Sequence, residues 1–175
     1  MKLEDTREYK LGLWGEESAE KLLEESGCMV VSKRLYTGEG APMLHGFKVK
    51  LILPDLDVSR QGKRWWVEVK TKKRPGYYGK RRCETHAVDC SNWTQYFRVQ
   101  KEMGSPVFLM VIEKLTGNIL LQSIDKLLPG LIVNEGCLAG TYSFPRSSFE
   151  LWATLGQGEM FTLRDREWLS SAMCK

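Results

Sequence analysis

Four charged residues lie on two neighbouring apolar segments of the sequence: Asp55, Asp57, Glu68 and Lys70. The dipeptide Gln61-Gly62 between the segments is typical of a two-residue hairpin turn, which would place Asp55 opposite Glu68. In that register all four side chains share one face. Two carboxylates this close repel each other, and burying them is costly unless a cation neutralises them. The spacing therefore predicts a divalent metal site at the end of a β-hairpin.

The chemistry expected of such a site is phosphodiester hydrolysis. Mg²⁺ (or Mn²⁺) prefers oxygen ligands and retains water, so Asp55, Glu68 and the backbone carbonyl of Val69 would hold it and leave positions for water and phosphate. The ion would polarise the phosphoryl oxygen and activate a water. Lys70 would orient or help deprotonate that water and offset charge on the phosphorus. Asp57 is the alternative metal-binding aspartate, although the pairing opposite Glu68 favours Asp55.

A strongly basic segment follows the two carboxylates directly. Residues 70–82, KTKKRPGYYGKRR, contain seven basic residues and no acidic one. Cations that neutralise phosphates release counterions, and tyrosines can stack on bases, so this segment is predicted to be a loop that contacts nucleic acid. A solvated turn with incidental charge is the alternative interpretation. The expected contacts are Lys72, Lys73, Arg74, Tyr77, Tyr78, Lys80, Arg81 and Arg82.

The elements that must position these residues follow from the hydrophobic periodicity. A first helix over 11–27 has an apolar stripe and ends at a glycine. A Gly- and Pro-containing loop at 35–46 could lie over the site. The other expected elements are strands at 28–31, 47–53, 56–58 and 65–69, a helix at about 92–103, and strands at 106–112 and 119–124. This order predicts an α/β fold with a mixed sheet flanked by helices.

The pair Pro54-Asp55 followed by Glu68-Val69-Lys70 resembles the signature of the PD-(D/E)xK nuclease superfamily. The first helix, with Gly12-x-x-x-Glu16-x-x-Ala19-x-x-x-Leu23-x-x-x-Gly27, is similar to the first helix of the archaeal-type Holliday junction resolvases, where the glutamate joins the active site. The resemblance covers about residues 11–113. It implies a restriction-endonuclease-like fold with an αβββαβ core, and Glu16 as an additional catalytic and metal-binding acid.

Two further polar residues are weaker candidates. Gln100, on the second helix, could reach the active site, as a polar residue there sometimes does in the superfamily, but a surface glutamine is an equal interpretation. His86, after the basic segment, could contact substrate or water, or be an ordinary polar loop histidine. A zinc site that combines His86 with Cys83, Asp89 and Cys90 would lack the second Cys or His pair of a finger.

Length and composition set the remaining expectations. A chain of 175 residues suits a single domain, here 1–175 with a nuclease-like core at about 11–124 and a C-terminal extension at about 125–175. Five cysteines without a CxxC pair, and an N-terminus without a signal-peptide core, favour a reducing, cytoplasmic setting. Apolar runs are too short to cross a membrane, so no membrane partner is expected.

These features together predict a Mg²⁺-dependent endo- or exodeoxyribonuclease that is structure-specific or junction-resolving. DNA is the expected partner and RNA an alternative one, and a junction resolvase would need a homodimer to make two symmetric cuts. The alternative function is a non-catalytic nucleic-acid-binding module of the same fold, which would have no need for acids that repel phosphate. An unrelated protein with a chance motif would bind neither Mg²⁺ nor DNA.

Overall fold

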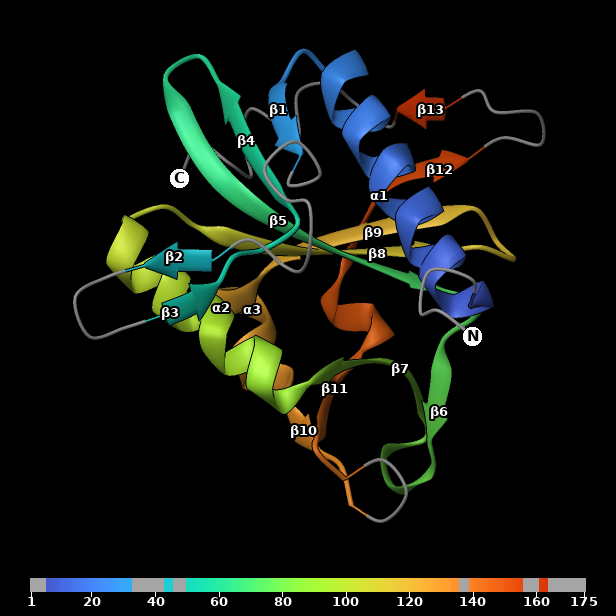
Figure 1. Cartoon of the computed structure of the whole chain (residues 1–175). Helices are drawn as coiled ribbons and strands as arrows, with labels where there is room; N and C mark the ends of the chain where they lie inside the picture. Colours follow the sequence, from blue (N-terminus) through green and yellow to red (C-terminus); the bar gives the residue numbers. More distant parts are fainter. Residues whose placement is uncertain (1–5, 33–42, 46–49, 136–138, 156–160, 164–175) are drawn as a thin grey trace.

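The computed structural model describes residues 6–32, 43–45, 50–135, 139–155 and 161–163 (Figure 1). Within these residues the chain forms a seven-stranded, a four-stranded and a two-stranded sheet. In chain order the elements are α1 (Arg7–Glu25), β1 (Met29–Ser32), β2 (Met43–His45), β3 (Lys50–Ile52), β4 (Leu56–Arg60), β5 (Lys63–Lys72), β6 (Gly76–Tyr78), η3 (Gly79–Arg81), β7 (Cys83–Asp89), α2 (Cys90–Met103), β8 (Val107–Glu113), β9 (Asn118–Ser123), α3 (Ile124–Leu127), η4 (Leu128–Gly130), β10 (Ile132–Val133), β11 (Thr141–Pro145), η6 (Arg146–Ser148), β12 (Glu150–Leu155) and β13 (Phe161–Leu163). None of the described helices is long and apolar enough to span a membrane.

The seven-stranded sheet has the order β1-β4-β5-β8-β9-β12-β13. Its only parallel pair among the described strands is β5 with β8, so the sheet is mixed. Every residue of β8 is buried, as predicted for a central strand covered on both faces. The predicted fold class, a mixed sheet with helices on its faces, is confirmed (Figure 1).

Each face of this sheet has its own helix and its own apolar core. Ala19, Leu22 and Leu23 of α1 pack on one face, against a core that includes Val67 and Val69. The aromatic residues of α2 pack on the other face, against a core that includes Trp66. Because side chains alternate along a strand, Glu68 and Lys70 of β5 lie on the face that α2 covers.

Gly15 of α1 lies very close to Thr71 of β5. A Cβ built on Gly15 would lie 1.7 Å from Oγ1 of Thr71, far inside van der Waals contact. We therefore expect Gly15→Ala to push α1 off β5 and to lower the free energy of unfolding by about 1–3 kcal/mol. Urea denaturation followed by circular dichroism measures this change.

Gly12 provides the matched control, because it lies one turn earlier in the same helix and a Cβ there would meet nothing within 4 Å. Gly12→Ala should be neutral or should stabilise the protein by up to about 1 kcal/mol, since alanine is the better helix former. Thr71→Ala in the Gly15→Ala background should restore part of the loss. Equal stability of the two single variants would contradict the close contact.

The β4–β5 hairpin has the turn and the register that the sequence predicts. Gln61 and Gly62 both have positive φ, 50° and 78°, as a type I′ turn requires. Leu56 pairs with Val67, and Asp57 pairs with Trp66. Continuing the ladder by one residue places Asp55 opposite Glu68.

The second sheet was not predicted. The basic segment, expected to be a loop, forms the edge strand β6 and the turn η3, and β6 pairs with β7 in the four-stranded order β10-β11-β7-β6. Described strands after residue 125 belong to both sheets: β11 pairs with β7 in the four-stranded sheet, and β12 pairs with β9 in the seven-stranded sheet. In the predicted loop at 35–46, Met43–His45 is the strand β2 and pairs with β3, and the rest of that loop lies outside the described residues.

Candidate active site

Asp55, Glu68 and Lys70 meet where the pairing of β4 with β5 ends. Asp55 Oδ2 accepts a hydrogen bond from the Val69 backbone N–H at 2.9 Å. Lys70 Nζ lies 2.5 Å from Glu68 Oε1, and Glu68 is only 4% exposed. Burial alone would lower the pKa of Lys70, but Glu68 and Asp55 outweigh it and raise that pKa, so the ammonium stays charged. The predicted catalytic trio is thus assembled at one place.

Val69 presents its backbone carbonyl at the same edge of β5. In an antiparallel ladder a residue's N–H and C=O point to the same neighbour, and the Val69 N–H points to Asp55. One further step of the register puts Pro54 opposite Val69. Proline has no N–H to donate to that carbonyl. The proline before Asp55 therefore provides no backbone donor for the Val69 carbonyl at the end of the ladder.

Asp57 is engaged differently from Asp55. Its two carboxylate oxygens accept bidentate hydrogen bonds from Arg64 at 2.8 and 2.6 Å. The guanidinium of Arg64 also lies over the Trp66 ring, 5.3 Å from its centroid. Asp57 is therefore neutralised by its own cation, whereas Asp55 lies beside Glu68 and Lys70.

Tyr96 of α2 is a site residue that the sequence did not single out. It is buried, its hydroxyl is hydrogen-bonded to Glu68, and burial together with the Glu68 charge raises its pKa, so it is a neutral donor. Its position in the apolar stripe of α2 is equally typical of a core aromatic residue. Only the hydroxyl group of Tyr96 could have indicated a role at the site. Gln100, one turn later, accepts from the Val107 N–H at 2.9 Å and donates to Asp125, away from Glu68.

Glu16 lies on α1, on the opposite face of the sheet from Glu68. It is half-buried and follows Gly15, which contacts Thr71 near the end of β5. Across the described part of the chain, no three His, Cys, Asp or Glu side chains lie close enough to hold a metal ion. The structure thus does not bring Glu16 together with Asp55 and Glu68.

The donors that do meet are two carboxylates and one backbone carbonyl. Asp55 and Glu68 share a small region, because both charges act on Lys70 and on Tyr96. Oxygen donors with few protein ligands fit a hard divalent cation that keeps several waters. The residues present therefore fit Mg²⁺ or Mn²⁺.

His86 lies inside a buried ionic cluster rather than at the surface. Its Nε2 is 3.0 Å from Glu113 Oε1, and both side chains are almost fully buried. Arg146 donates two hydrogen bonds to the Glu113 carboxylate, at 2.7 and 2.9 Å. Thr116 and Asn118 also donate to it. This Glu113 cluster joins the end of β8 to β7 of the second sheet and to η6, which follows β11.

The basic hairpin, residues 73–82, extends from the site into solvent. It begins after Lys72, and β7 returns from it to Asp89, whose charge acts on Lys70, Lys72 and Tyr96. Lys80 lies 3.4 Å from Glu135, but both side chains are exposed, so this pair contributes little. Tyr78 is half-buried, whereas the exposed basic and aromatic residues of the hairpin are Lys73, Arg74, Tyr77, Lys80, Arg81 and Arg82.

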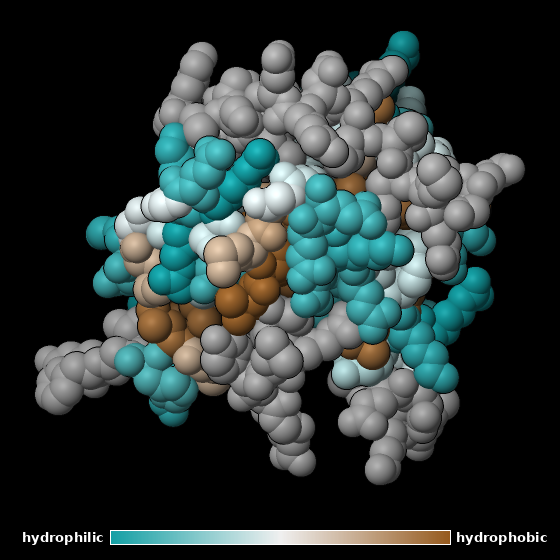
Figure 2. Space-filling model, turned by 90° about the horizontal axis from the view of Figure 1, so that it is seen from above, coloured by the Kyte–Doolittle hydropathy of each residue, from teal (hydrophilic) through white to brown (hydrophobic). Residues whose placement is uncertain are grey.

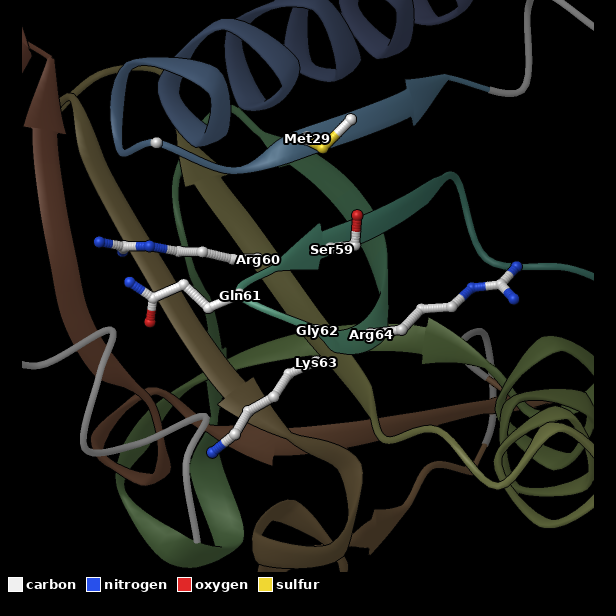
Figure 3. A pocket seen from close by; sticks show the side chains of 8 residues that line it. Met29, Ser59, Arg60, Gln61, Gly62, Lys63 and Arg64 are labelled. Atoms are coloured by element: carbon white, nitrogen blue, oxygen red, sulfur yellow. The ribbon is translucent and has the colours of Figure 1, made fainter.

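A surface hollow of about 460 Å³ lies at the other end of β5, at the tip of the β4–β5 hairpin. In Figure 3 the side chains of Arg60 and Lys63 extend to one side and that of Arg64 to the other, so the cations diverge. Seen from this end of the molecule, hydrophilic residues flank a hydrophobic patch (Figure 2). Among the described residues, the lining includes no carboxylate, which is the side chain that a hard metal ion prefers.

No protein-family model and no curated protein matches the sequence. Among solved structures, the chain is similar to Hjc, a Holliday junction resolvase from Archaeoglobus fulgidus, with 12% identity and a TM-score of 0.51 over 79% of this chain and 86% of that one. It is also similar to D212, a nuclease from a fusselovirus, with 10% identity and a TM-score of 0.46 over 82% of this chain and 84% of that one. The likeness to Hjc confirms the predicted fold class, a mixed sheet flanked by helices, and shows the fold alone.

Proposed function

We propose that this chain is a metal-dependent nuclease that hydrolyses phosphodiester bonds in DNA. The observation that supports the proposal best is the meeting of Asp55, Glu68 and Lys70 at one end of the β4–β5 hairpin. A nearly buried carboxylate beside a second carboxylate is costly in a protein that has no cation for them.

Asp55, Glu68 and the carbonyl of Val69 are the proposed ligands of Mg²⁺ or Mn²⁺. A metal ion held there would polarise a phosphoryl oxygen and lower the pKa of a bound water. The Val69 N–H and the Tyr96 hydroxyl each hold one carboxylate in place, so both are oriented before the metal ion arrives. Glu16 remains a proposed additional ligand.

Lys70 has a charge-stabilising role in this proposal. Its ammonium is held by Glu68, and its raised pKa keeps it protonated at neutral pH. A protonated lysine cannot take a proton from water, so Lys70 would orient the attacking water and offset the negative charge that develops on the phosphate.

The basic hairpin is the proposed nucleic-acid contact. It begins directly after Lys72, two residues beyond Lys70, and its cations are exposed, so a bound backbone could pass from the hairpin to Lys70. Tyr77 is 69% exposed and available to stack on a base. DNA is the proposed substrate, and RNA is an alternative that the experiment below includes.

Cleavage of a labelled panel tests the proposed function. The panel contains linear duplex, single strand, flap, four-way junction and RNA, with Mg²⁺, Mn²⁺ or EDTA. We expect metal-dependent cleavage that Glu68→Gln abolishes, while Glu102→Gln, which removes an exposed acid of α2, retains it. The junction is included because the first-helix motif resembles that of the junction resolvases, and symmetric cuts would require a homodimer.

Two results would overturn the proposal. Salt-sensitive DNA binding without cleavage of any substrate would indicate the non-catalytic binding module. The absence of both DNA binding and cleavage would indicate a chance motif on this fold.

A further inference from the structure

β5 presents a third charged side chain in line with Glu68 and Lys70. Lys72 follows Lys70 by two residues and therefore lies on the same face, which α2 and β7 cover. Lys72 is half-buried, unlike the exposed cations of the basic hairpin. Two lysines thus follow one carboxylate along the same face of one strand.

Lys70 forms an ion pair with a carboxylate, and Lys72 differs from it in this respect. Lys70 has Glu68 at 2.5 Å, whereas no carboxylate in the described part of the chain forms an ion pair with Lys72. The acid beside Lys72 in the β5–β8 register is Glu113, and Arg146 already binds that carboxylate. Asp89 acts on Lys72 only through space.

This environment favours a bound anion. Burial lowers the pKa of Lys72, the charge of Lys70 lowers it further, and Asp89 only partly opposes them. An anion placed between the two ammonium groups would be attracted by both and would relieve their repulsion. The phosphodiester of the proposed substrate is such an anion.

We propose that Lys72 is a second phosphate-binding lysine, which holds a non-bridging oxygen of the phosphodiester being cut together with Lys70. The proposal rests on the proposed nuclease function and adds a residue to its catalytic site. The Cα atoms of residues two apart on a strand are about 6.6 Å apart, so two lysines can approach one phosphate from neighbouring directions. No bond forms or breaks at Lys72, which contributes only its charge and its hydrogen-bond donors.

Single-turnover cleavage with enzyme in excess tests this role. We expect Lys72→Met to slow the cleavage step on the order of 10²-fold, while the Kd for DNA measured in EDTA changes less than about threefold. Lys72→Arg, which keeps the charge, should recover most of the rate. Lys101→Met removes an exposed lysine from the last turn of α2 and should cut like wild type. Circular dichroism and thermal melting verify that each variant is folded.

A second measurement does not depend on cleavage. Acetylation by acetic anhydride, read by mass spectrometry in EDTA, should show that bound DNA protects Lys72 but not Lys101. A folded Lys72→Met variant that cuts at the wild-type rate would overturn the proposal, and so would equal acetylation of Lys72 with and without DNA. If wild type cuts no substrate, the nuclease function fails, while the acetylation result still decides whether Lys72 contacts phosphate.

Discussion

Asp55→Asn should abolish cleavage, and Asp57→Asn should leave it within about threefold of wild type. The two aspartates lie two residues apart on one face of the same hairpin, yet their surroundings differ. Asp55 adjoins Glu68 and Lys70, whereas Arg64 binds both oxygens of Asp57. A metal ligand supplies several kcal/mol of transition-state stabilisation, so its loss should slow cleavage on the order of 10³-fold.

Asparagine is the appropriate replacement at both positions. It keeps a side-chain oxygen that can accept from the Val69 N–H, so Asp55→Asn removes charge with little change in the hairpin. The DNA affinity of the Asp55→Asn variant in EDTA should be equal to or higher than that of wild type, because this variant lacks a negative charge near the phosphate. Single-turnover cleavage in Mg²⁺ and fluorescence anisotropy in EDTA measure the two quantities.

The reverse result would be informative. If Asp57→Asn abolished cleavage and Asp55→Asn did not, Asp57 would have to leave Arg64 for the metal ion, and the hairpin register would shift on metal binding. Loss of cleavage in both variants would indicate that the Arg64–Asp57 pair also positions the site. Only retention of cleavage by Asp55→Asn contradicts the proposed ligand.

The hairpin could be predicted from sequence because its determinants are local. Gln61-Gly62 selects a two-residue turn, and the turn fixes which residues face each other. The wholly apolar β8 was predictable for a similar reason, since only a strand covered on both faces tolerates such a run. Asp55 opposite Glu68 follows from these local signals.

The second sheet could not be predicted in this way. β6 has three residues, Gly76–Tyr78, too few for an alternating pattern, and its partner β7 pairs on its other side with β11, more than 50 residues later in the chain. Charge dominates the pattern of this segment, and for that reason the sequence predicts a loop there. The hydrogen bond between Tyr96 and Glu68 could not be predicted either, because the two residues lie on different elements that are far apart in the sequence.

Glu16 shows the limit of helical periodicity as a guide to a site. The apolar stripe places Glu16 at the border of the buried face, and the residue is half-buried as expected. The stripe cannot tell which face of the sheet the helix will cover. Gly15 packs against Thr71, on the face away from Glu68, so a role for Glu16 requires its carboxylate to reach around the edge of β5.

Glu113→Gln should cost about 3 kcal/mol of unfolding free energy at pH 7, because it removes the charge that Arg146 and the buried His86 surround. Burial alone would raise the pKa of Glu113, but hydrogen bonds from Arg146, Thr116 and Asn118 outweigh it and lower the pKa to about 2. For a protein of this size the loss corresponds to roughly 6–12 °C in Tm. Urea denaturation at several pH values measures it.

The pH dependence distinguishes a charge effect from a packing effect. Because the folded pKa is about 2 and the ordinary value 4.5, the stabilisation by the Glu113 charge is complete above pH 4.5 and is lost as the pH falls toward 2. The gap between wild type and Glu113→Gln should therefore narrow by about 1.4 kcal/mol per pH unit in that window. Glu150→Gln, which removes a surface partner of Lys126 at 3.7 Å, should change stability by less than about 0.5 kcal/mol at any pH. A gap of the same size at pH 7 and at pH 3.5 would show that the two sheets are held together by packing around residue 113 and not by its charge.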